Sequence, residues 1–206
     1  MPVPGALAEV GAEPVPGKAG PEGVQHLCID GAFVYYGVGR FEDDRGLFEE
    51  IEVKASEPPT ILQSAFASSQ KNVLRGIHCS PYGKIVVCLS GEMFDALVDL
   101  RPDSKTYMQW DAALLSPGRR TRIYVPPGVG HGYLAMQDNT SNVYLKLGLY
   151  EKSKELEVNA LDPALGIQWP KPLVGNSYII SPKDGGLPSL EKARELPTWG
   201  QTRSKL

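Results

Sequence analysis

The sequence predicts an all-β fold, an antiparallel sandwich or barrel, from two observations. Short runs rich in β-branched and aromatic residues recur along the 206-residue chain, and its 22 glycines and 18 prolines punctuate them. Helical segments do not alternate with these runs, as they would in a parallel sheet. Only residues 187–197, LPSLEKARELP, have helical character, with Ser189 as the expected N-cap and Pro197 as the expected end.

The strand-like runs follow one another at regular spacing. In chain order they are GAFVYYGVGRF (31–41), TILQSAFASS (60–69), KIVVCLSGEMFDALVDL (84–100), YMQWDAALLS (107–116), TRIYVPPGV (121–129), GYLAMQD (132–138) and SNVYLKLGLY (141–150). Turn residues separate them at 81–83, 90–91, 102–103, 117–118 and 138–139. Pro, Gly, Asn and Asp at these places favour tight connections between strands.

The last of these runs alternates between two kinds of side chain. One face carries only aliphatic residues, namely Val143, Leu145, Leu147 and Leu149. The other face carries Tyr144, Lys146, Gly148 and Tyr150. We expect the aliphatic face to pack into the core and the face of Tyr144 to line a polar cavity or a solvated surface.

Composition and charge restrict the classes of protein. With 42% hydrophobic and 22% charged residues, the chain is expected to form a single domain over residues 24–206, after a flexible Pro/Gly/Ala-rich tail over residues 1–23. A net charge of −3 gives no electrostatic case for nucleic acid or an anionic membrane. No apolar run approaches the roughly 20 residues of a membrane span, and the N-terminus does not resemble a signal peptide. Cys28, Cys79 and Cys88 follow no paired spacing, which is typical of reduced thiols in a cytoplasmic protein.

The histidines do not predict a metal site. The chain has His26, His78 and His131, without the paired spacing that a strand-borne metal site uses. A nucleophile is not indicated either, since there is no GxSxG sequence and the cysteines suit a small apolar core role.

An acid–base site is the better hypothesis for the stretch NVLRGIHCSPYGK, residues 72–84. Arg75, His78 and Lys84 lie close together along the chain, on either side of a tight turn. Cations near an imidazole suit an anionic ligand and a developing negative charge. Spacing alone leaves two interpretations open: His78 is a base, or it is a hydrogen-bonded core residue.

A resemblance to a known family adds to this interpretation. FEDDRGLFEE, NVLRGIH, GKIVVCLSGEMFDALVDLRPDSKTYMQW, LLSPG, YVPPGVGHGY, DPALGIQWP and ISPKDGGLP occur in the order found in the dTDP-4-dehydrorhamnose 3,5-epimerase family. The chain resembles that family from about Phe41 to about Leu190. The resemblance implies a cupin-type jelly-roll β-barrel with short C-terminal helical segments, and activity without metal or cofactor. It also implies a homodimer that shares strands, with the region before Phe41 as the exchanged part.

The resemblance also implies a site. It makes His78 the base, Asp184 the carboxylate that accepts its Nδ1 proton, and Tyr144 the acid that returns a proton to the sugar. Lys84, with Arg75, would stabilise the enolate oxygen. The other residues matched to ligand contacts or to the pocket wall are Arg45, Glu50, Gln63, Arg120 and His131. Ala65 stands where the family has an Asn after this Gln.

The expected substrate is a nucleotide-linked 4-keto-6-deoxy sugar, epimerised at C3, at C5 or at both. Two alternatives stay open from the sequence. One is a single-site epimerase of a GDP- or CDP-linked keto sugar or heptose. The other is a non-catalytic sugar-nucleotide-binding module, which would not need His78, Asp184 and Tyr144 together.

Overall fold

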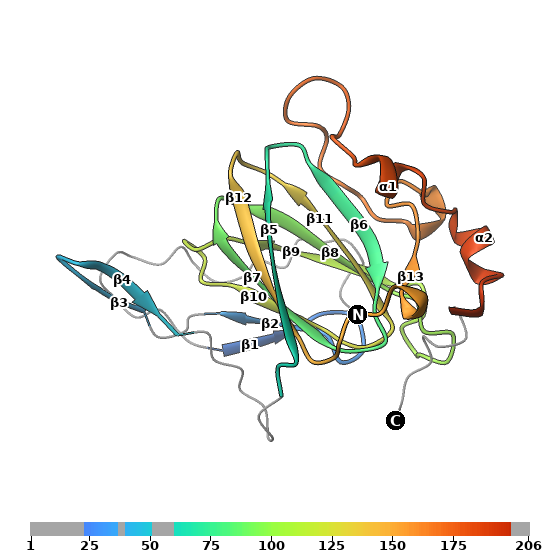
Figure 1. Cartoon of the computed structure of the whole chain (residues 1–206), viewed down its shortest axis with the longest axis horizontal. Coiled ribbons are helices and arrows are strands. Elements are labelled where there is room, and N and C mark those ends of the chain that lie inside the picture. Colours follow the sequence, from blue (N-terminus) through green and yellow to red (C-terminus); the bar gives the residue numbers. More distant parts are fainter. Residues whose placement is uncertain (1–22, 37–39, 51–59, 199–206) are drawn as a thin grey trace.

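The computed structural model describes residues 23–36, 40–50 and 60–198, and these form two β-sheets and a separate hairpin (Figure 1). The expected tail lies outside the described residues, apart from Gly23. Mostly antiparallel β-structure with only short helices confirms the predicted all-β class. From β5 to β12 the chain passes from one sheet to the other at every connection except that between β8 and β9.

The larger sheet has six strands in the order β1-β2-β10-β7-β12-β5. They are β1 (Gly23–His26), β2 (Phe33–Tyr36), β10 (Arg122–Val125), β7 (Lys84–Ser90), β12 (Thr140–Lys146) and β5 (Gln63–Ser69). The second sheet has the order β13-β6-β11-β8-β9. Its strands are β13 (Leu156–Glu157), β6 (Leu74–Cys79), β11 (Val129–Ala135), β8 (Met93–Asp99) and β9 (Trp110–Leu115). The hairpin consists of β3 (Arg40–Asp43) and β4 (Gly46–Glu49).

The inner core fills the space between the two sheets. It takes Val86, Ile123 and Val34 from the six-stranded sheet, and Leu97 and Tyr133 from the five-stranded sheet. Because side chains alternate along a strand, every second residue of β7, β8 and β11 points into this space. The inner core therefore tells us which polar residues of the same strands point inward.

A second core lies on the outer side of the five-stranded sheet. Ile77 and Val98 of that sheet pack there with Leu165, Leu190 and Ala193 of the C-terminal part. The C-terminal part contains α1 (Pro182–Gly185), α2 (Leu190–Arg194) and the 3-10 turns Lys152–Lys154 and Pro163–Leu165. The predicted cap is confirmed, since the Ser189 hydroxyl accepts a hydrogen bond from the backbone of Lys192. Among the described residues, no helix is long and apolar enough to cross a membrane.

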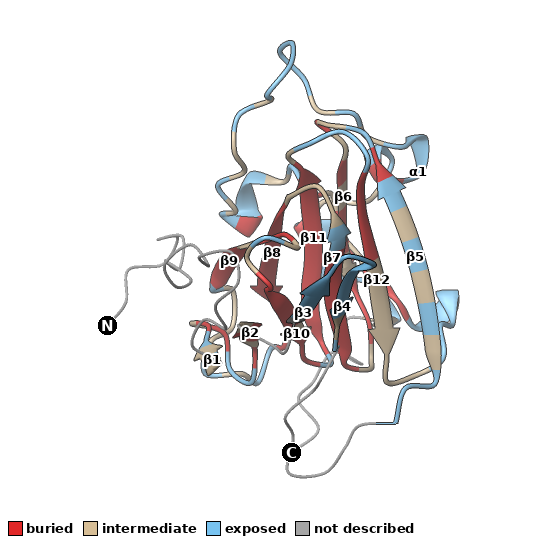
Figure 2. Cartoon of the chain, turned by 90° about the vertical axis from the view of Figure 1, so that its left-hand side faces the viewer, coloured by how far each residue is buried: buried red, intermediate tan, exposed pale blue. Residues whose placement is uncertain are grey.

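The expectation that the aliphatic face of β12 packs into the core is wrong. Leu149 is 62% exposed, and Val143, Leu145 and Leu147 are only half-buried and belong to neither core. Tyr144 packs against the inner core instead. Aliphatic character alone could not identify the core side, because the space between the sheets also holds polar groups. Figure 2 shows β8, β9 and β11 buried, whereas β5, next to β12, alternates between intermediate and exposed residues.

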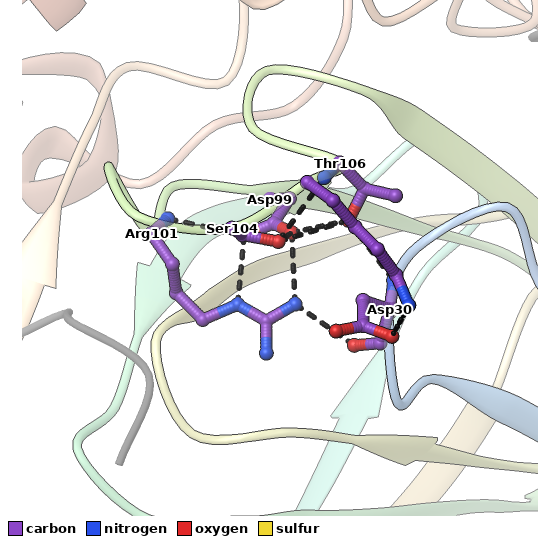
Figure 3. A network of polar contacts seen from close by, with 6 residues as sticks. Asp30, Asp99, Arg101, Ser104 and Thr106 are labelled. Atoms are coloured by element: carbon purple, nitrogen blue, oxygen red, sulfur yellow. Dashed lines mark hydrogen bonds and ion pairs between the residues drawn. The ribbon is translucent and has the colours of Figure 1, made fainter. Parts of the chain in front are cut away.

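A polar network fixes the turn between β1 and β2 to the connection that follows β8 (Figure 3). Buried Asp99 accepts hydrogen bonds from Arg101, Ser104 and Thr106. Burial raises the pKa of Asp99, but these donors lower it by more, so the pKa lies below its usual value. Arg101 also donates to the backbone oxygen of Asp30, 2.8 Å away. The network satisfies buried charges and holds the N-terminal hairpin against the five-stranded sheet.

Gly76 and Gly132 let β6 and β11 approach closely. Gly76 has φ = +121°, and a Cβ at Gly76 would lie 2.6 Å from the Cα of Gly132. The pairing register shifts between His131 and Tyr133, which lie on either side of Gly132. Only glycine adopts this backbone conformation readily. The irregularity lies between Arg75 and His78, so it sets how β6 directs both side chains inward.

We expect Gly76→Ala to lower the free energy of unfolding by about 2 kcal/mol or more, from backbone strain and the contact with Gly132. Gly118→Ala is the matched control, because a Cβ there meets nothing closer than the Ser116 hydroxyl at 4.0 Å. Chemical denaturation of both variants measures the difference. Equal stability of the two variants would contradict this account of β6.

Candidate active site

Six polar side chains from five strands share the space between the sheets. Lys84 lies two residues before Val86, and Asp95 and His131 lie between inner-core residues of β8 and β11, so the alternation points all three inward. Tyr144 packs on the inner core directly. Cross-strand partners share a face of a sheet, so Arg75 opposite Tyr133 and His78 opposite His131 point inward too.

His78 lies between two carboxylates. Its Nδ1 is 3.0 Å from Glu157 Oε1, and its Nε2 is 3.5 Å from Asp184 Oδ1. Asp184 Oδ2 accepts a hydrogen bond from the backbone of Gly76 at 3.3 Å. The structure thus brings Asp184 to His78 as expected, but at Nε2. The expected pairing of Asp184 with Nδ1 is wrong, because Glu157 occupies that side of the ring.

The two carboxylates favour a protonated imidazole. Burial lowers the pKa of His78, and so does nearby Lys84, but Asp184 and Glu157 raise it by more, so its pKa lies above the ordinary value. In return, His78 and then Lys183 lower the pKa of Glu157 to about 2, against the effect of burial. Burial also opposes ionisation of Asp184, yet contact with His78 leaves its pKa below the usual range. Both carboxylates are therefore ionised at neutral pH.

Lys84 is a buried amine beside His78. It is 5% exposed, and its Nζ donates to the backbone oxygen of His78 at 3.4 Å. Burial lowers the pKa of Lys84, whereas the negative charges of Glu155 and Asp95 act in the opposite direction. Among the described residues, no carboxylate forms an ion pair with Lys84, and a buried ammonium in this position strongly attracts an oxyanion that reaches it.

His131 and Asp95 form a second, fully buried histidine–carboxylate pair. His131 Nε2 is 2.8 Å from Asp95 Oδ2, and the two side chains are 3% and 0% exposed. Burial lowers the pKa of His131 more than Asp95 raises it, so His131 is neutral at neutral pH. Asp95 Oδ1 has no hydrogen-bond partner among the described residues. The pKa of His131 is thus shifted in the opposite direction to that of His78, its cross-strand neighbour.

Tyr144 lies beside His131, with ring centroids 6.0 Å apart and edge-to-face geometry. Burial raises the pKa of Tyr144, and the nearby Tyr133 and Asp95 raise it further. The phenol therefore keeps its proton at neutral pH.

Arg75 reaches the same space from β6. Its Nε donates to Ser69 Oγ at 3.1 Å, and Ser69 Oγ lies 2.9 Å from the Tyr133 hydroxyl. A second guanidinium nitrogen donates to the backbone oxygen of Ser68 at 3.2 Å. The guanidinium is therefore held at β5, the edge strand of the six-stranded sheet.

The other residues matched to ligand contacts do not join this group within the chain. Arg45 lies at the tip of the β3–β4 hairpin, where its side chain is 90% exposed and pairs with Asp43. The backbone oxygen of Glu50 accepts from Arg122 at 2.9 Å, and Gln63 accepts from the backbone of Tyr150 at 3.0 Å. Arg120 is buried in the turn before β10.

Sequence reasoning missed two residues that contact the histidines, Glu157 and Asp95. A charged residue in the apolar run MFDALVD is a signal that could have identified Asp95, since buried charges need partners. Glu157 had no such signal, because YEKSKELE resembles a solvated charged connection. In the part of the chain that the structure describes, no group of three or more His, Cys, Asp or Glu side chains is arranged to hold a metal ion.

Comparisons with known proteins give the class. The rmlC epimerase of Mycobacterium tuberculosis superposes with a TM-score of 0.79 at 35% identity, covering 87% of this chain and 96% of that one. A 3'-monoepimerase of Streptomyces bikiniensis, solved with dTDP-quinovose, gives a TM-score of 0.75 at 31% identity over 84% of this chain and 90% of that one. The protein is thus a carbohydrate epimerase, an isomerase of the cupin-type jelly-roll class.

The sequence comparisons give the family. The dTDP-4-dehydrorhamnose 3,5-epimerase family profile matches residues 26–192. The dTDP-4-dehydrorhamnose 3,5-epimerase of M. tuberculosis (strain CDC 1551 / Oshkosh) is 37% identical over 174 residues, which cover 78% of this chain and 86% of that protein. The chain belongs to the dTDP-4-dehydrorhamnose 3,5-epimerase family.

Proposed function

We propose that the protein epimerises a dTDP-linked 4-keto-6-deoxy sugar by removing and returning protons next to the ketone. Its relatives support the substrate class, since one is named for dTDP-4-dehydrorhamnose and another was solved with dTDP-quinovose. The observation that supports the chemistry most directly is the group Arg75, His78, Lys84 and Tyr144, gathered between the sheets. A non-catalytic binding module has no use for a base, a buried cation and a protonated phenol together.

The base in this proposal is His78. The C4 ketone acidifies the C–H bonds at C3 and C5, so a neutral imidazole can remove one of these protons and leave an enolate. The negative charge then lies on the C4 oxygen, where buried Lys84 stabilises it, with Arg75 as a further cation. The resulting imidazolium is stabilised by Asp184 and Glu157.

The acid is Tyr144. Its burial keeps the phenol protonated, so it can deliver a proton to the carbanion carbon from the face opposite to His78, which inverts the centre. The phenolate takes a proton from water, and His78 returns its proton to water, so no atoms are gained or lost over the cycle. Neutral His131, in edge contact with Tyr144, positions the phenol without adding a charge.

Deuterium uptake tests the proposal and shows how many carbons of the sugar exchange a proton with solvent. We expect the protein, incubated in D₂O with a dTDP-4-keto-6-deoxy sugar, to incorporate deuterium that mass spectrometry detects. Two deuterons indicate inversion at C3 and C5, as the name of the 3,5-epimerase relatives implies, and one indicates a monoepimerase like the S. bikiniensis protein. No uptake would contradict the proposed function and would favour the alternative, a non-catalytic sugar-nucleotide-binding module.

We expect His78→Ala to lose turnover by about 10²–10⁴-fold, the usual contribution of a general base. Tyr144→Phe removes only the hydroxyl, so it should fold, bind nucleotide and still exchange a substrate proton through His78, but without inversion. Comparing deuterium exchange with product stereochemistry separates the two roles. Inversion at a near-normal rate in Tyr144→Phe would assign the acid to another group.

We further propose that the protein works as a homodimer in the cytoplasm. The outer face of β5 and β12 carries an apolar patch: Phe66 is 66% exposed, and its cross-strand partner is half-buried Val143. A second copy packed there removes this surface from water. The projecting β3–β4 hairpin, which carries Arg45 and Phe48, would then reach the partner, where Arg45 can meet substrate (Figure 1). The cysteines are free thiols, as in reducing compartments.

We expect Phe66→Glu to convert the dimer into monomers, because it places a charge in an apolar contact. Val174→Glu is the matched control, since Val174 is 63% exposed in a loop outside the six-stranded sheet. Light scattering coupled to size-exclusion chromatography measures both masses. A monomeric unaltered protein, or a dimeric Phe66→Glu variant, would overturn this contact.

A further inference from the structure

We propose that Glu157 is a positioning residue for the base, holding the Nδ1 side of His78 so that Nε2 is left to receive the substrate proton, with Lys183 fixing Glu157. The inference deepens the proposed function, on which it rests for the identity of His78 as the base. Glu157 is the residue that the sequence reasoning passed over as part of a solvated connection.

The backbone fixes Glu157 opposite His78. The short strand β13 pairs with β6 so that Glu157 and His78 are direct cross-strand partners. Ile77 and Val158, the next pair along, exchange two backbone hydrogen bonds of 2.8 and 3.0 Å. Directly opposed residues of an antiparallel pair have Cβ atoms about 4.5–5.5 Å apart on the same face. The contact between the two side chains is therefore set by sheet register and does not depend on a flexible loop.

The contact of Glu157 with the ring is closer than that of Asp184. Glu157 Oε1 is 3.0 Å from Nδ1, a hydrogen-bonding distance, whereas Asp184 Oδ1 is 3.5 Å from Nε2. Lys183 Nζ donates to Glu157 Oε1 at 2.5 Å, and Lys183 is the neighbour of Asp184 in α1. The same helical turn thus supplies the Asp184 carboxylate and the cation that anchors Glu157.

A neutral imidazole has one N–H and one lone pair, so it can donate to only one of two carboxylates. Donation to Glu157 from Nδ1 leaves the lone pair on Nε2, which is the form a base needs. When Nε2 takes up the substrate proton, Asp184 already lies beside it and stabilises the new N–H. The two carboxylates then have different roles: Glu157 selects the tautomer, and Asp184 stabilises the imidazolium.

The charges that face His78 come from every element packed around it. Glu157 on β13 and Asp184 on α1 are negative, whereas Lys183 on α1 and Lys84 on β7 are positive. His131 on β11 is neutral and is paired with Asp95 on β8. Without the charge of Glu157, Asp184 is the one negative group near His78 in this set, beside the cations Lys84 and Lys183. The protonated form of His78 is then less stable, and its pKa falls.

The first test needs no substrate. We expect an NMR titration of the His78 ring to show a lower pKa in Glu157→Gln than in the unaltered protein, because a charge is lost while an acceptor for Nδ1–H is kept. Lys183→Met removes a cation and should shift the pKa of His78 upward. Glu151→Gln, which alters an exposed glutamate paired with Lys154, is the matched control and should change nothing. An unchanged titration in Glu157→Gln would overturn the inference.

The second test separates positioning from substrate contact. Glu157→Ala, which loses both charge and acceptor, should lower kcat by about 10- to 100-fold, as removal of partners that orient histidines does elsewhere, with KM little changed. Glu157→Gln should recover part of kcat, with the acid limb of kcat/KM moved to lower pH. A raised KM with unchanged kcat would instead place Glu157 against the substrate.

These outcomes separate the two proposals. If the unaltered protein takes up no deuterium, the proposed function fails, yet the titration of His78 still decides whether Glu157 controls its ring. If the protein epimerises but Glu157→Ala keeps a normal kcat, the proposed function stands and the inference about Glu157 fails. Thermal unfolding of each variant, followed by circular dichroism, confirms that it is folded.

Discussion

The site depends on the pairing of β6 on both of its edges. β11 pairs along one edge and β13 along the other, so His131, His78 and Glu157 form a row across three strands. Backbone hydrogen bonds maintain this row, and their register decides which side chains meet. Because a shift of one residue would turn His78 away from the inner space, the close approach of Gly76 and Gly132 is part of the same constraint.

Burial and neighbouring charges shift the pKa values of the two neighbouring histidines in opposite directions. His131 contacts one carboxylate and its side chain is only 3% exposed. The effect of burial on its pKa therefore exceeds that of Asp95, and the neutral ring is favoured. His78 is 28% exposed and has two carboxylates, whose attraction exceeds the cost of burial. On each ring the carboxylates raise the pKa and burial lowers it, and the larger of the two effects differs between the rings. The fold therefore favours the protonated form of one imidazole and the neutral form of the other within a single strand pair.

Local signals in the sequence predicted the local parts of the structure. Most strand-like runs contain the observed strands, and Ser189 caps the C-terminal helix as expected. The resemblance placed His78, Asp184 and Tyr144, and the structure brings Asp184 to His78. What could not be predicted depends on long-range register. The inward side of β12 depends on what faces it across the sheets, and the contact between Glu157 and His78 spans 79 positions of the chain.

Within the proposed mechanism, the choice between C3 and C5 need not depend on the base His78. One base and one acid on opposite faces of a ring can serve C3 or C5, provided that the sugar can present each carbon in turn. In the proposed mechanism, the inner face of β5 and β12, which carries Ala65 and Tyr144, forms one wall beside the sugar. Ala65, the cross-strand partner of Tyr144, is small and leaves room beside the acid, whereas an Asn there would bring an amide next to the phenol. Under the proposed function, the space that Ala65 leaves beside Tyr144 therefore bears on which carbons the sugar can present to the acid.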